Sequence, residues 1–219
     1  MKAFVSWSGG KDCTLALYKF MQANPEAEVA ALLNMNRVVK HNAHRLSGEL
    51  LQAQAEALGI KLNRVDVDDN FDYAHNFQAA VNHLKEQEGI DCGIFGDIYL
   101  EPHLDWVREQ CRQLGITPIF PLLNIDVHQL YSDFVEAGFK SKVVAVKLTH
   151  PLQSLLGQDL SMENYAEMIK IEGFDVCGEL GEFHSFVYDG PIFSEAVKWR
   201  IESEFKSEKH HGYNMDVER

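Results

Sequence analysis

Cysteine is scarce in this sequence, and long apolar runs are missing. The four cysteines, Cys13, Cys92, Cys111 and Cys177, lie far apart and form no Cys-x-x-Cys pair. This spacing argues against a zinc knuckle and against a disulfide framework, so we expect reduced thiols. No apolar stretch approaches the roughly 20 residues needed to span a bilayer, and a strand pattern starts at the N-terminus without a cleavable apolar segment. We therefore expect a cytoplasmic protein without a membrane partner.

Basic residues are also few. The 20 lysines and arginines stand against 33 aspartates and glutamates, which gives a formal net charge of −13. Such a charge opposes binding to the phosphate backbone of nucleic acids and argues against an RNA substrate. The hydrophobic content of 46% and the charged content of 24% are those of a globular protein that can bury a substantial core.

Two common nucleotide motifs are absent as well. Neither Gly-x-x-x-x-Gly-Lys-Ser/Thr nor a strand followed by Gly-x-Gly-x-x-Gly occurs, which disfavours kinase-like and dinucleotide-binding functions. What is present is Ser8-Gly9-Gly10-Lys11-Asp12-Cys13, between an apolar run over 1–7 and a helical pattern over 14–22. Adjacent glycines let successive backbone N–H groups point into one concavity, and a helix N-terminus favours an anion there. The loop predicts a binding site for the phosphates of ATP.

Every residue of this loop is a candidate nucleotide ligand, namely Ser8, Gly9, Gly10, Lys11, Asp12 and Cys13. Lys11 carries an ammonium group that can neutralise phosphate charge, and we expect Lys11 and Asp12 to take part in catalysis. Asp12 is the candidate metal ligand, since it can hold Mg²⁺ or orient Lys11; a helix cap is its alternative role. For the whole loop, the alternative is a glycine turn that only starts a helix.

Short apolar runs alternate with helical patterns over residues 1–120. We expect strands at 2–7, 29–35, 61–67, 92–96 and 116–120, and helices at 14–22, 46–58, 71–87 and 103–114. This order predicts an α/β fold with a doubly wound, five-stranded parallel sheet and helices on both faces. Ligands of such sheets bind at the carboxyl ends of the strands where the strand order reverses. That rule places the nucleotide beside the glycine loop.

Further candidate nucleotide ligands lie at the ends of the expected strands. Asn34 is at the end of the second strand, and we expect it on the adenine or ribose side. Gly96 and Asp97 end the fourth strand; Asp97 can contact the metal or the ribose, or cap a helix. His44 and Arg45 begin the helix after the second strand and can contact the triphosphate or a substrate carboxylate, a surface ion pair being the alternative.

The pattern changes after residue 122, which predicts an ATP-binding domain over 1–122 and a smaller α/β lobe over 123–205 that binds the substrate. The lobe is expected to hold helices at 127–137 and 162–172 and strands at 142–148 and 183–188. Residues 206–219 are predicted to be a loosely held polar tail. The tail contains His210 and His211, and a solvated terminus explains them better than a metal site.

A second group of reactive side chains lies in the segment 175–191. It combines glycines with Glu179, Glu182 and His184, and strand alternation would place Glu182 and His184 on one face. We expect these three residues to take part in catalysis, because turn chemistry alone does not require this cluster. A hairpin with exposed acids is the alternative.

The glycine loop in its strand-to-helix context resembles the PP-loop ATP pyrophosphatases, with a HUP-like fold. Over most of its length the chain resembles the diphthine–ammonia ligase family. The matching segments are Ser6 to Asp12, Gln54 to Ile60, Gly96 to Ile98, Cys177 to Glu182 and Asp189 to Pro191. The resemblance implies a ligase that uses ATP and Mg²⁺ to adenylate a carboxylate of diphthine, a modified histidine on elongation factor 2. Ammonia then displaces AMP to form an amide. Glu179, Glu182 and His184 would bind ammonium and accept its proton.

The sequence departs from the family at two positions, Leu180 in place of Gly and Cys13 in place of Ser. The acceptor therefore stays open between a protein-borne and a small-molecule carboxylate, because bacterial relatives are thought to act on other substrates, including in cobamide salvage. A regulator that holds ATP or AMP without chemistry is the alternative from another class. The source of ammonia, free or from a glutaminase partner, and the oligomeric state, with a homodimer among the options, also stay open.

Overall fold

The computed structural model describes residues 1–37, 45–67, 72–149, 151 and 153–218. The chain divides into two compact units, which are described separately. The first unit comprises Met1–Ser8, Asp12–Asn42 and Ile60–Asn124, and the second comprises Gly9–Lys11, Ala43–Gly59 and Ile125–Arg219. The assignment of residues 1–122 to an ATP-binding domain and of residues 123–205 to a substrate-binding lobe remains a prediction.

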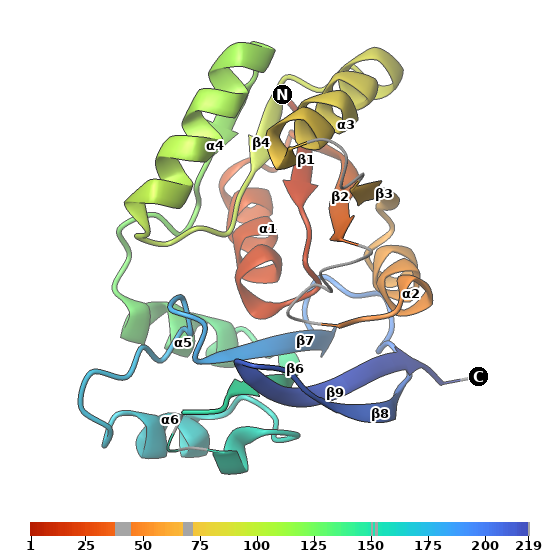
Figure 1. Ribbon diagram of the computed structural model, residues 1–219. Helices are drawn as coiled ribbons and strands as arrows, with labels where there is room; N and C mark the ends of the chain where they lie inside the picture. Colours follow the sequence, from red (N-terminus) through yellow and green to blue (C-terminus); the bar gives the residue numbers. More distant parts are fainter. Residues whose placement is uncertain (38–44, 68–71, 150, 152, 219) are drawn as a thin grey trace. The chain divides into compact units, whose positions relative to one another are not determined.

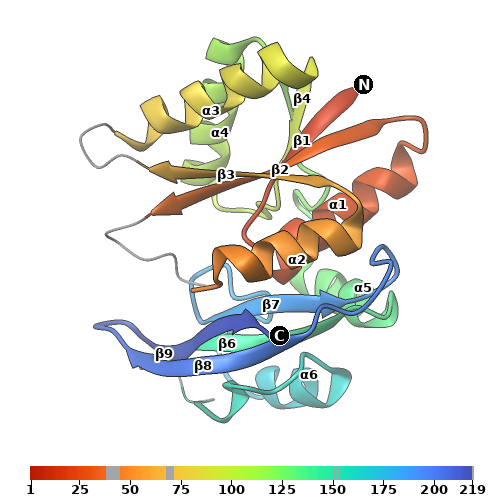
Figure 2. The same ribbon diagram turned by 90° about the vertical axis from the view of Figure 1, so that its right-hand side faces the viewer.

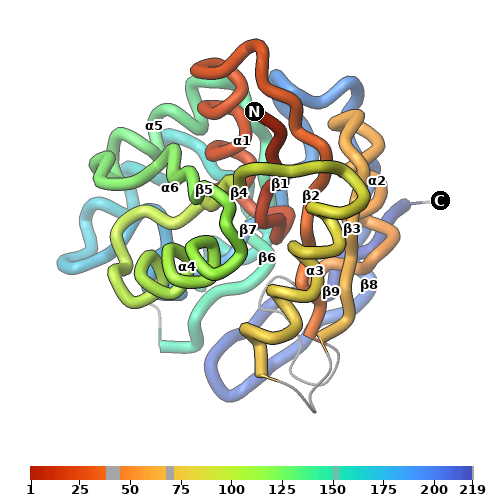
Figure 3. Tube along the Cα trace, turned by 90° about the horizontal axis from the view of Figure 1, so that it is seen from above, coloured from red at the N-terminus to blue at the C-terminus, as the bar shows by residue number. Residues whose placement is uncertain are grey.

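The first unit contains one five-stranded parallel sheet. Its strands are β1 (Lys2–Ser6), β2 (Glu28–Arg37), β3 (Lys61–Val67), β4 (Cys92–Ile94) and β5 (Thr117–Ile119), in the order β3-β2-β1-β4-β5. Figure 3 shows this order across the unit. The predicted five-stranded parallel sheet is confirmed, and the order reverses at β1, so the carboxyl ends of β1 and β4 form the expected ligand edge.

Helices cover both faces of this sheet. Figure 2 shows α3 (Tyr73–Glu88) and α4 (Glu101–Leu114) on one face and α1 (Lys11–Ala23) on the opposite face. The side with α3 and α4 is held by a cluster of buried side chains that includes Phe4, Phe77 and Phe95. The Phe4 and Phe95 rings meet edge to face with centroids 5.8 Å apart, a geometry that aromatic pairs prefer. The prediction of a doubly wound α/β fold is confirmed.

The second unit is built on a four-stranded antiparallel sheet. Its strands are β6 (Lys140–Lys147), β7 (Phe183–Asp189), β8 (Trp199–Lys206) and β9 (His210–Val217), in the order β7-β6-β9-β8. Helix α2 (Gly48–Leu58) lies against this sheet (Figure 1). Leu50 of the helix belongs to the same buried cluster as Val144 and Phe186 of the sheet. The unit also holds α5 (Val127–Glu136), the short 3₁₀ turn η1 (Gln153–Leu155) and α6 (Met162–Met168).

The prediction of a loosely held tail over 206–219 is wrong. Strand β9 lies inside the sheet, pairs with β6 on one side and with β8 on the other, and buries Met215. A Cβ added at Gly212 would lie 2.5 Å from the carbonyl oxygen of Val144, so glycine permits the close approach to β6. Strand pairing uses backbone groups, which is why a segment poor in apolar residues can still form a central strand.

Two further differences concern the end of one helix and a strand that was not predicted. The helix expected over 162–172 ends at Met168, because the following residues form turns that lead to Gly173 with a positive φ of 72°. Strand β8 was not predicted; most of its side chains are exposed, so it lacks the apolar alternation of a half-buried strand. No helix among the described residues is long and apolar enough to cross a membrane.

Candidate functional site

The glycine loop follows β1 and has a backbone that only glycine adopts easily. Gly9 has a positive φ of 83°, in the left-handed region. A Cβ at this position would lie 2.6 Å from Leu46 Cδ1 and 2.7 Å from Gln54 Oε1. Both the torsion and the space therefore require glycine at position 9.

The loop is hydrogen-bonded to the outer edge of β7. The backbone N–H of Val187 donates to the carbonyl oxygen of Gly9 over 2.9 Å, and the N–H of Lys11 donates to the hydroxyl of Ser185 over 3.1 Å. Gln54, with no exposed surface, donates through Nε2 to the oxygens of Gly9 (3.0 Å) and Val187 (2.6 Å). β7 is an edge strand, so its unpaired backbone groups are available to hold the loop.

Gln54 and Ser185 were not among the predicted site residues, although both lie in the segments singled out in the sequence. The signal that could have found Gln54 is a large polar residue on the apolar face of α2, beside the buried Leu50 and Leu51. For Ser185, the signal is a hydroxyl between apolar residues in a strand. Buried polar side chains of this kind need hydrogen-bond partners, and the glycine loop provides them.

Lys11 begins α1 and is only 5% exposed. Its Nζ atom lies 5.6 Å from the centre of the Phe183 ring, within the range of a cation–π contact. Three residues of β7 thus contact Gly9–Lys11: Phe183 through its ring, Ser185 through its hydroxyl and Val187 through its backbone N–H.

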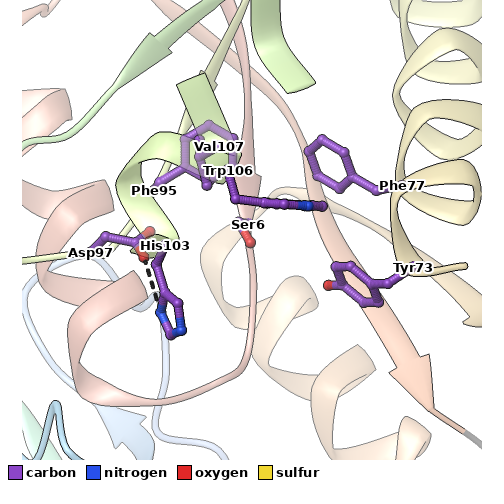
Figure 4. Close-up of a pocket in the computed structure, with 8 residues that line it drawn as sticks. All are labelled: Ser6, Tyr73, Phe77, Phe95, Asp97, His103, Trp106 and Val107. Atoms are coloured by element: carbon purple, nitrogen blue, oxygen red, sulfur yellow. Dashed lines mark ion pairs between the residues drawn. The ribbon is translucent and has the colours of Figure 1, made fainter. Parts of the chain in front are cut away.

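In the first unit, the end of β4 closely approaches the first turn of α1. A Cβ at Gly96 would lie 2.9 Å from both the carbonyl carbon of Asp12 and the nitrogen of Cys13. Burial raises the pKa of Asp97, His103 lowers it (Figure 4), and the negative charge of Asp12 has a smaller effect that raises it. The close approach at Gly96 therefore brings Asp97, the next residue, near Asp12 at the ligand edge of the sheet. Cys13 is buried, with Sγ 3.5 Å from Ser8 Oγ.

Asn34 and Arg45 have other contacts, and His44 lies outside the described residues. Asn34 is 4% exposed and donates through Nδ2 to the carbonyl oxygen of Trp7 over 2.8 Å. Its Oδ1 atom is buried and has no hydrogen-bond partner among the described residues. The Arg45 guanidinium lies 3.8 Å from the centre of the Phe205 ring. β2 continues to Arg37, so Asn34 lies inside the strand and not at its predicted end. Asn34 thus ties β2 to Trp7, the residue that follows β1.

The acidic turn before β7 is organised by Asp175, which was not predicted. Its Oδ1 accepts the N–H of Cys177 over 2.8 Å, and its Oδ2 accepts the N–H of Glu179 over 3.1 Å. Gly178 and Gly181 take positive φ values of 73° and 79°. An aspartate that bonds backbone groups two and four residues later is a turn signal that the sequence did contain.

Glu182 is the buried carboxyl of this turn, 9% exposed. Its Oε2 atom has no hydrogen-bond partner in the described part of the chain. Burial raises the pKa of Glu182, the charge of Asp175 raises it further, and Lys147 acts in the opposite direction. The carboxyl is thus held ready to bind a cation or accept a proton.

His184 lies beside His210 of β9, with ring centroids 5.1 Å apart. His210 Nε2 is 3.0 Å from the carbonyl oxygen of Gly181, so this nitrogen must carry a proton and donate. His211 pairs with Glu204 of β8. Both histidines of the supposed tail are therefore held by the sheet and the acidic turn.

Among the described residues, no three His, Cys, Asp or Glu side chains form a group suited to a metal ion. Asp12 and Asp97, which lie near each other at the ligand edge, are a pair of carboxylates that could hold a metal ion. A magnesium ion bound with phosphates keeps several waters and needs one or two protein carboxylates, so two suffice.

Curated proteins resemble this chain over most of its length. Diphthine–ammonia ligase from Danio rerio is 27% identical over 215 residues, covering 87% of this chain and 83% of the relative. The enzyme of that name from Mus musculus is 26% identical over 215 residues, covering 87% and 79%. Among solved structures, a predicted subunit of tRNA methyltransferase from Methanocaldococcus jannaschii aligns with 14% identity, covering 87% of this chain and 98% of that chain, with a TM-score of 0.44.

Two family profiles match consecutive parts of the sequence. The profile of the diphthamide synthase N-terminal domain matches residues 1–118, and the profile of the diphthamide synthase C-terminal domain matches residues 126–219. The first match contains the glycine loop and Asp97, and the second contains the acidic turn and β7. The resemblance inferred from the motifs is confirmed, and the chain belongs to the diphthamide synthase family.

Proposed function

We propose that this chain is an ATP-dependent ligase that joins ammonia to a carboxylate and forms an amide. Family membership supports the ligase class, since the curated relatives are named diphthine–ammonia ligases. The observation that carries the proposal is the glycine loop: Gly9 has a positive φ, and Gln54 and Val187 hold its carbonyl oxygen. A loop built in this way at a helix N-terminus suits a phosphate chain.

The reaction needs ATP because a carboxylate is a poor acceptor for ammonia. Its negative charge repels nucleophiles, and oxide is not a usable leaving group. A carboxylate oxygen therefore attacks the α-phosphorus of ATP, the bond to the β-phosphate breaks, and pyrophosphate leaves. Neutral ammonia then attacks the acyl carbon, AMP leaves with the former carboxylate oxygen, and a base takes a proton from the newly bonded nitrogen.

The loop residues would bind and neutralise the phosphates. We assign backbone N–H groups of the loop Ser8 to Cys13 to phosphate oxygens, except that of Lys11, which donates to Ser185. The Lys11 ammonium would neutralise the developing charge on pyrophosphate. Asp12 and Asp97 would hold Mg²⁺, which would neutralise phosphate charge and so reduce the repulsion that an incoming carboxylate meets. The close backbone approach between Gly96 and Asp12, next to Asp97, supports their use as a pair.

The acidic turn would handle ammonia. Ammonia is mostly protonated at neutral pH, and a buried carboxylate binds ammonium and accepts its proton. Glu182 suits this role, because its Oε2 is buried without a hydrogen-bond partner in the described residues and burial raises its pKa. We assign supporting roles to Glu179, whose N–H is held by Asp175, and to His184.

The names of the curated relatives make diphthine on a protein the first acceptor to test. A cobamide-related carboxylate is the second acceptor to test. A regulator that binds ATP or AMP without chemistry is the remaining alternative. Ammonia would come free from solution or from a glutaminase partner, and a homodimer stays a prediction.

The test is release of pyrophosphate and AMP from ATP and Mg²⁺ with ammonium and each acceptor in turn. The ligase should release both products only when acceptor and ammonium are present. Lys11→Ala should abolish turnover, whereas Lys198→Ala, at an exposed lysine, should not change it. A melting temperature that rises with ATP, without pyrophosphate from either acceptor, would instead identify a regulator.

A second variant tests the acidic turn. Glu182→Gln should bind ATP normally and form amide at least tenfold more slowly, because the amide side chain cannot accept a proton. Glu172→Gln, at an exposed glutamate of the preceding turn, is the matched control. Normal amide synthesis by Glu182→Gln would exclude the proposed base.

A further inference from the structure

Three polar side chains share one row of the antiparallel sheet in the second unit. Strand β6 lies between β7 and β9 (Figure 1). On the β7 side, the backbone N–H of Lys147 donates to the carbonyl oxygen of Glu182 over 2.9 Å. This hydrogen bond is one step beyond the register pair of Val146 and Phe183. On the β9 side, Lys147 pairs with His210. Residues directly opposite each other in antiparallel strands point to the same face, so Glu182, Lys147 and His210 form one row.

The two histidine rings agree with this arrangement. His184 comes two residues after Glu182, and residues two apart along a strand face the same way. Its ring lies 5.1 Å from the ring of His210, measured between centroids. The small Ala145 of β6 is paired with His184, so the rings can meet across β6. Lys147 therefore has a carboxyl on one neighbouring strand and an imidazole on the other.

The backbone of Lys147 is held on both sides. Besides the N–H bond to Glu182, its carbonyl oxygen accepts a hydrogen bond of 2.7 Å from Nε2 of Gln153. The N–H of the next residue, Leu148, donates to the carbonyl oxygen of Lys209 over 2.7 Å. The side chain of Lys147 is partly exposed. Its ammonium group thus reaches out from a fixed position in the row.

The lysines of β6 differ in the use of their ammonium groups. Lys140 forms an ion pair of 2.9 Å with Asp189, and Lys142 forms one of 2.9 Å with Asp159. Within the described part of the chain, no ion pair or side-chain hydrogen bond engages the ammonium of Lys147. This ammonium is therefore available to an anionic ligand.

The neighbour of this ammonium is a carboxyl that also has binding capacity left. Oε2 of Glu182 is buried and has no hydrogen-bond partner among the described residues. The positive charge of Lys147 lowers the pKa of Glu182, against the larger effect of burial, and no hydrogen bond joins the two side chains. A carboxylate and a cation that are close but not paired can receive two ligands of opposite charge side by side.

The proposed reaction has two such ligands, ammonium and the carboxylate of the acceptor. Glu182 alone would attract the first and repel the second, because like charges close together repel each other. A cation beside Glu182 offsets this repulsion. A hydrogen bond from an ammonium group to a carboxylate is also among the stronger kinds.

We propose that Lys147 binds the carboxylate of the acceptor while Glu182 holds the ammonium. The inference rests on the proposed function and adds the residue that binds the acceptor. No bond forms or breaks in this step; the row only holds the acyl carbon next to the nitrogen that will attack it. Such placement of two reactants lowers the entropic part of the barrier.

Steady-state kinetics with the diphthine-bearing protein and with the cobamide-related carboxylate test the assignment. Lys147→Gln should raise the KM for the acceptor about tenfold or more, since a charged hydrogen bond is lost, and should leave the KM for ATP unchanged. Lys147→Arg keeps the charge and should restore most of the affinity. Lys206→Gln, at an exposed lysine of β8, is the matched control. An unchanged KM for the acceptor, or an equal rise in both KM values, would overturn the proposal.

A binding measurement gives a readout without turnover. The full chain, labelled with ¹³C at the lysine Cε atoms, is titrated with sodium propionate by NMR in the presence of ammonium chloride. The Lys147 signal, assigned by its loss in Lys147→Gln, should shift to saturation. Propionamide, which has nearly the same shape without the charge, should not shift it. The signal of the ion-paired Lys140 is the internal reference.

The two proposals fail in different ways. A Lys147 signal that propionate leaves unchanged would overturn the carboxylate site. If only the proposed function fails, the unaltered chain releases no pyrophosphate with either acceptor, while propionate still shifts the Lys147 signal.

Discussion

The backbone N–H of Lys11 donates a hydrogen bond to the hydroxyl of Ser185, 174 residues further along the chain. Both residues are buried, Lys11 at 5% and Ser185 at 3% exposure. The hydrogen bond lies inside the second unit, which contains the loop residues Gly9–Lys11 as well as β7. The conformation of the glycine loop therefore depends on a strand near the C-terminus.

Replacing Ser185 by alanine should weaken ATP binding about tenfold. The variant removes the acceptor of a buried N–H, and an unsatisfied buried group costs about 1–3 kcal/mol. Calorimetric titration with ATP measures the effect. Ser154→Ala, at an exposed serine, is the control. Equal affinity of Ser185→Ala and the unaltered chain would show that the loop holds its shape without this hydrogen bond.

Gln54→Met should lower both thermal stability and ATP affinity. The side chains have similar size, but methionine cannot donate to the carbonyl oxygens of Gly9 and Val187. Loss of buried hydrogen bonds of this kind costs about 1–3 kcal/mol, which corresponds to a drop of about 2–12 °C in a chain of this size. Thermal unfolding measures this drop in melting temperature. Gln52→Met, on the exposed face of the same helix, is the control. A melting temperature equal to that control would contradict the role of Gln54.

Glu182 should make stability depend on pH. Burial raises its pKa in the folded chain, so its contribution to stability is complete below the usual glutamate pKa and is lost as the pH rises through the raised value. The glutamine side chain of Glu182→Gln does not ionise, so this variant does not lose stability as the pH rises through the raised pKa. Relative to the unaltered chain, its free energy of unfolding should therefore increase from about pH 4 upward.

Urea unfolding at several pH values measures this difference for Glu182. The exposed Glu172, replaced by glutamine, serves as the reference. A stability difference between Glu182→Gln and the unaltered chain that stays constant with pH would contradict a raised pKa.

His210→Ala should slow amide formation several-fold without changing the KM for ATP. His210 donates to the carbonyl oxygen of Gly181, so its loss would loosen the turn that carries Glu182 and leave the glycine loop intact. His210→Gln, which can donate from a similar distance, should restore most of the rate. His83→Ala, on the exposed side of α3, is the control. A change in the KM for ATP alone would contradict the assignment.

Much of the first unit could be predicted from the sequence, because its elements have local signals. The strand Lys61–Val67 was predicted with the bounds that the structure has. The glycine loop was placed between β1 and α1 because paired glycines and a switch of apolar periodicity are visible in neighbouring residues. The candidate residues Asp12 and Asp97 came from their places after strands of one parallel sheet, and the structure brings them near each other.

The partners of those residues could not be predicted in the same way. Strand β9 has few apolar residues, so its central position follows from pairing with β6 and β8. The sequence shows Gln54 as a polar residue within a helix, but nothing in the sequence connects it with Gly9 and Val187. Such contacts depend on register and on the packing of distant segments.

The order of strands and helices in the first unit, the glycine loop and the acidic turn were set by local residue types, because backbone torsions, capping and periodicity act over a few residues. Tertiary structure alone decided that β7 supports the loop, that Glu182 is buried, and that Trp106, Phe77 and Tyr73 surround a cavity. Burial and hydrogen-bond geometry arise only when segments far apart in the chain meet, and the pKa of a carboxyl or the shape of a pocket changes at that point.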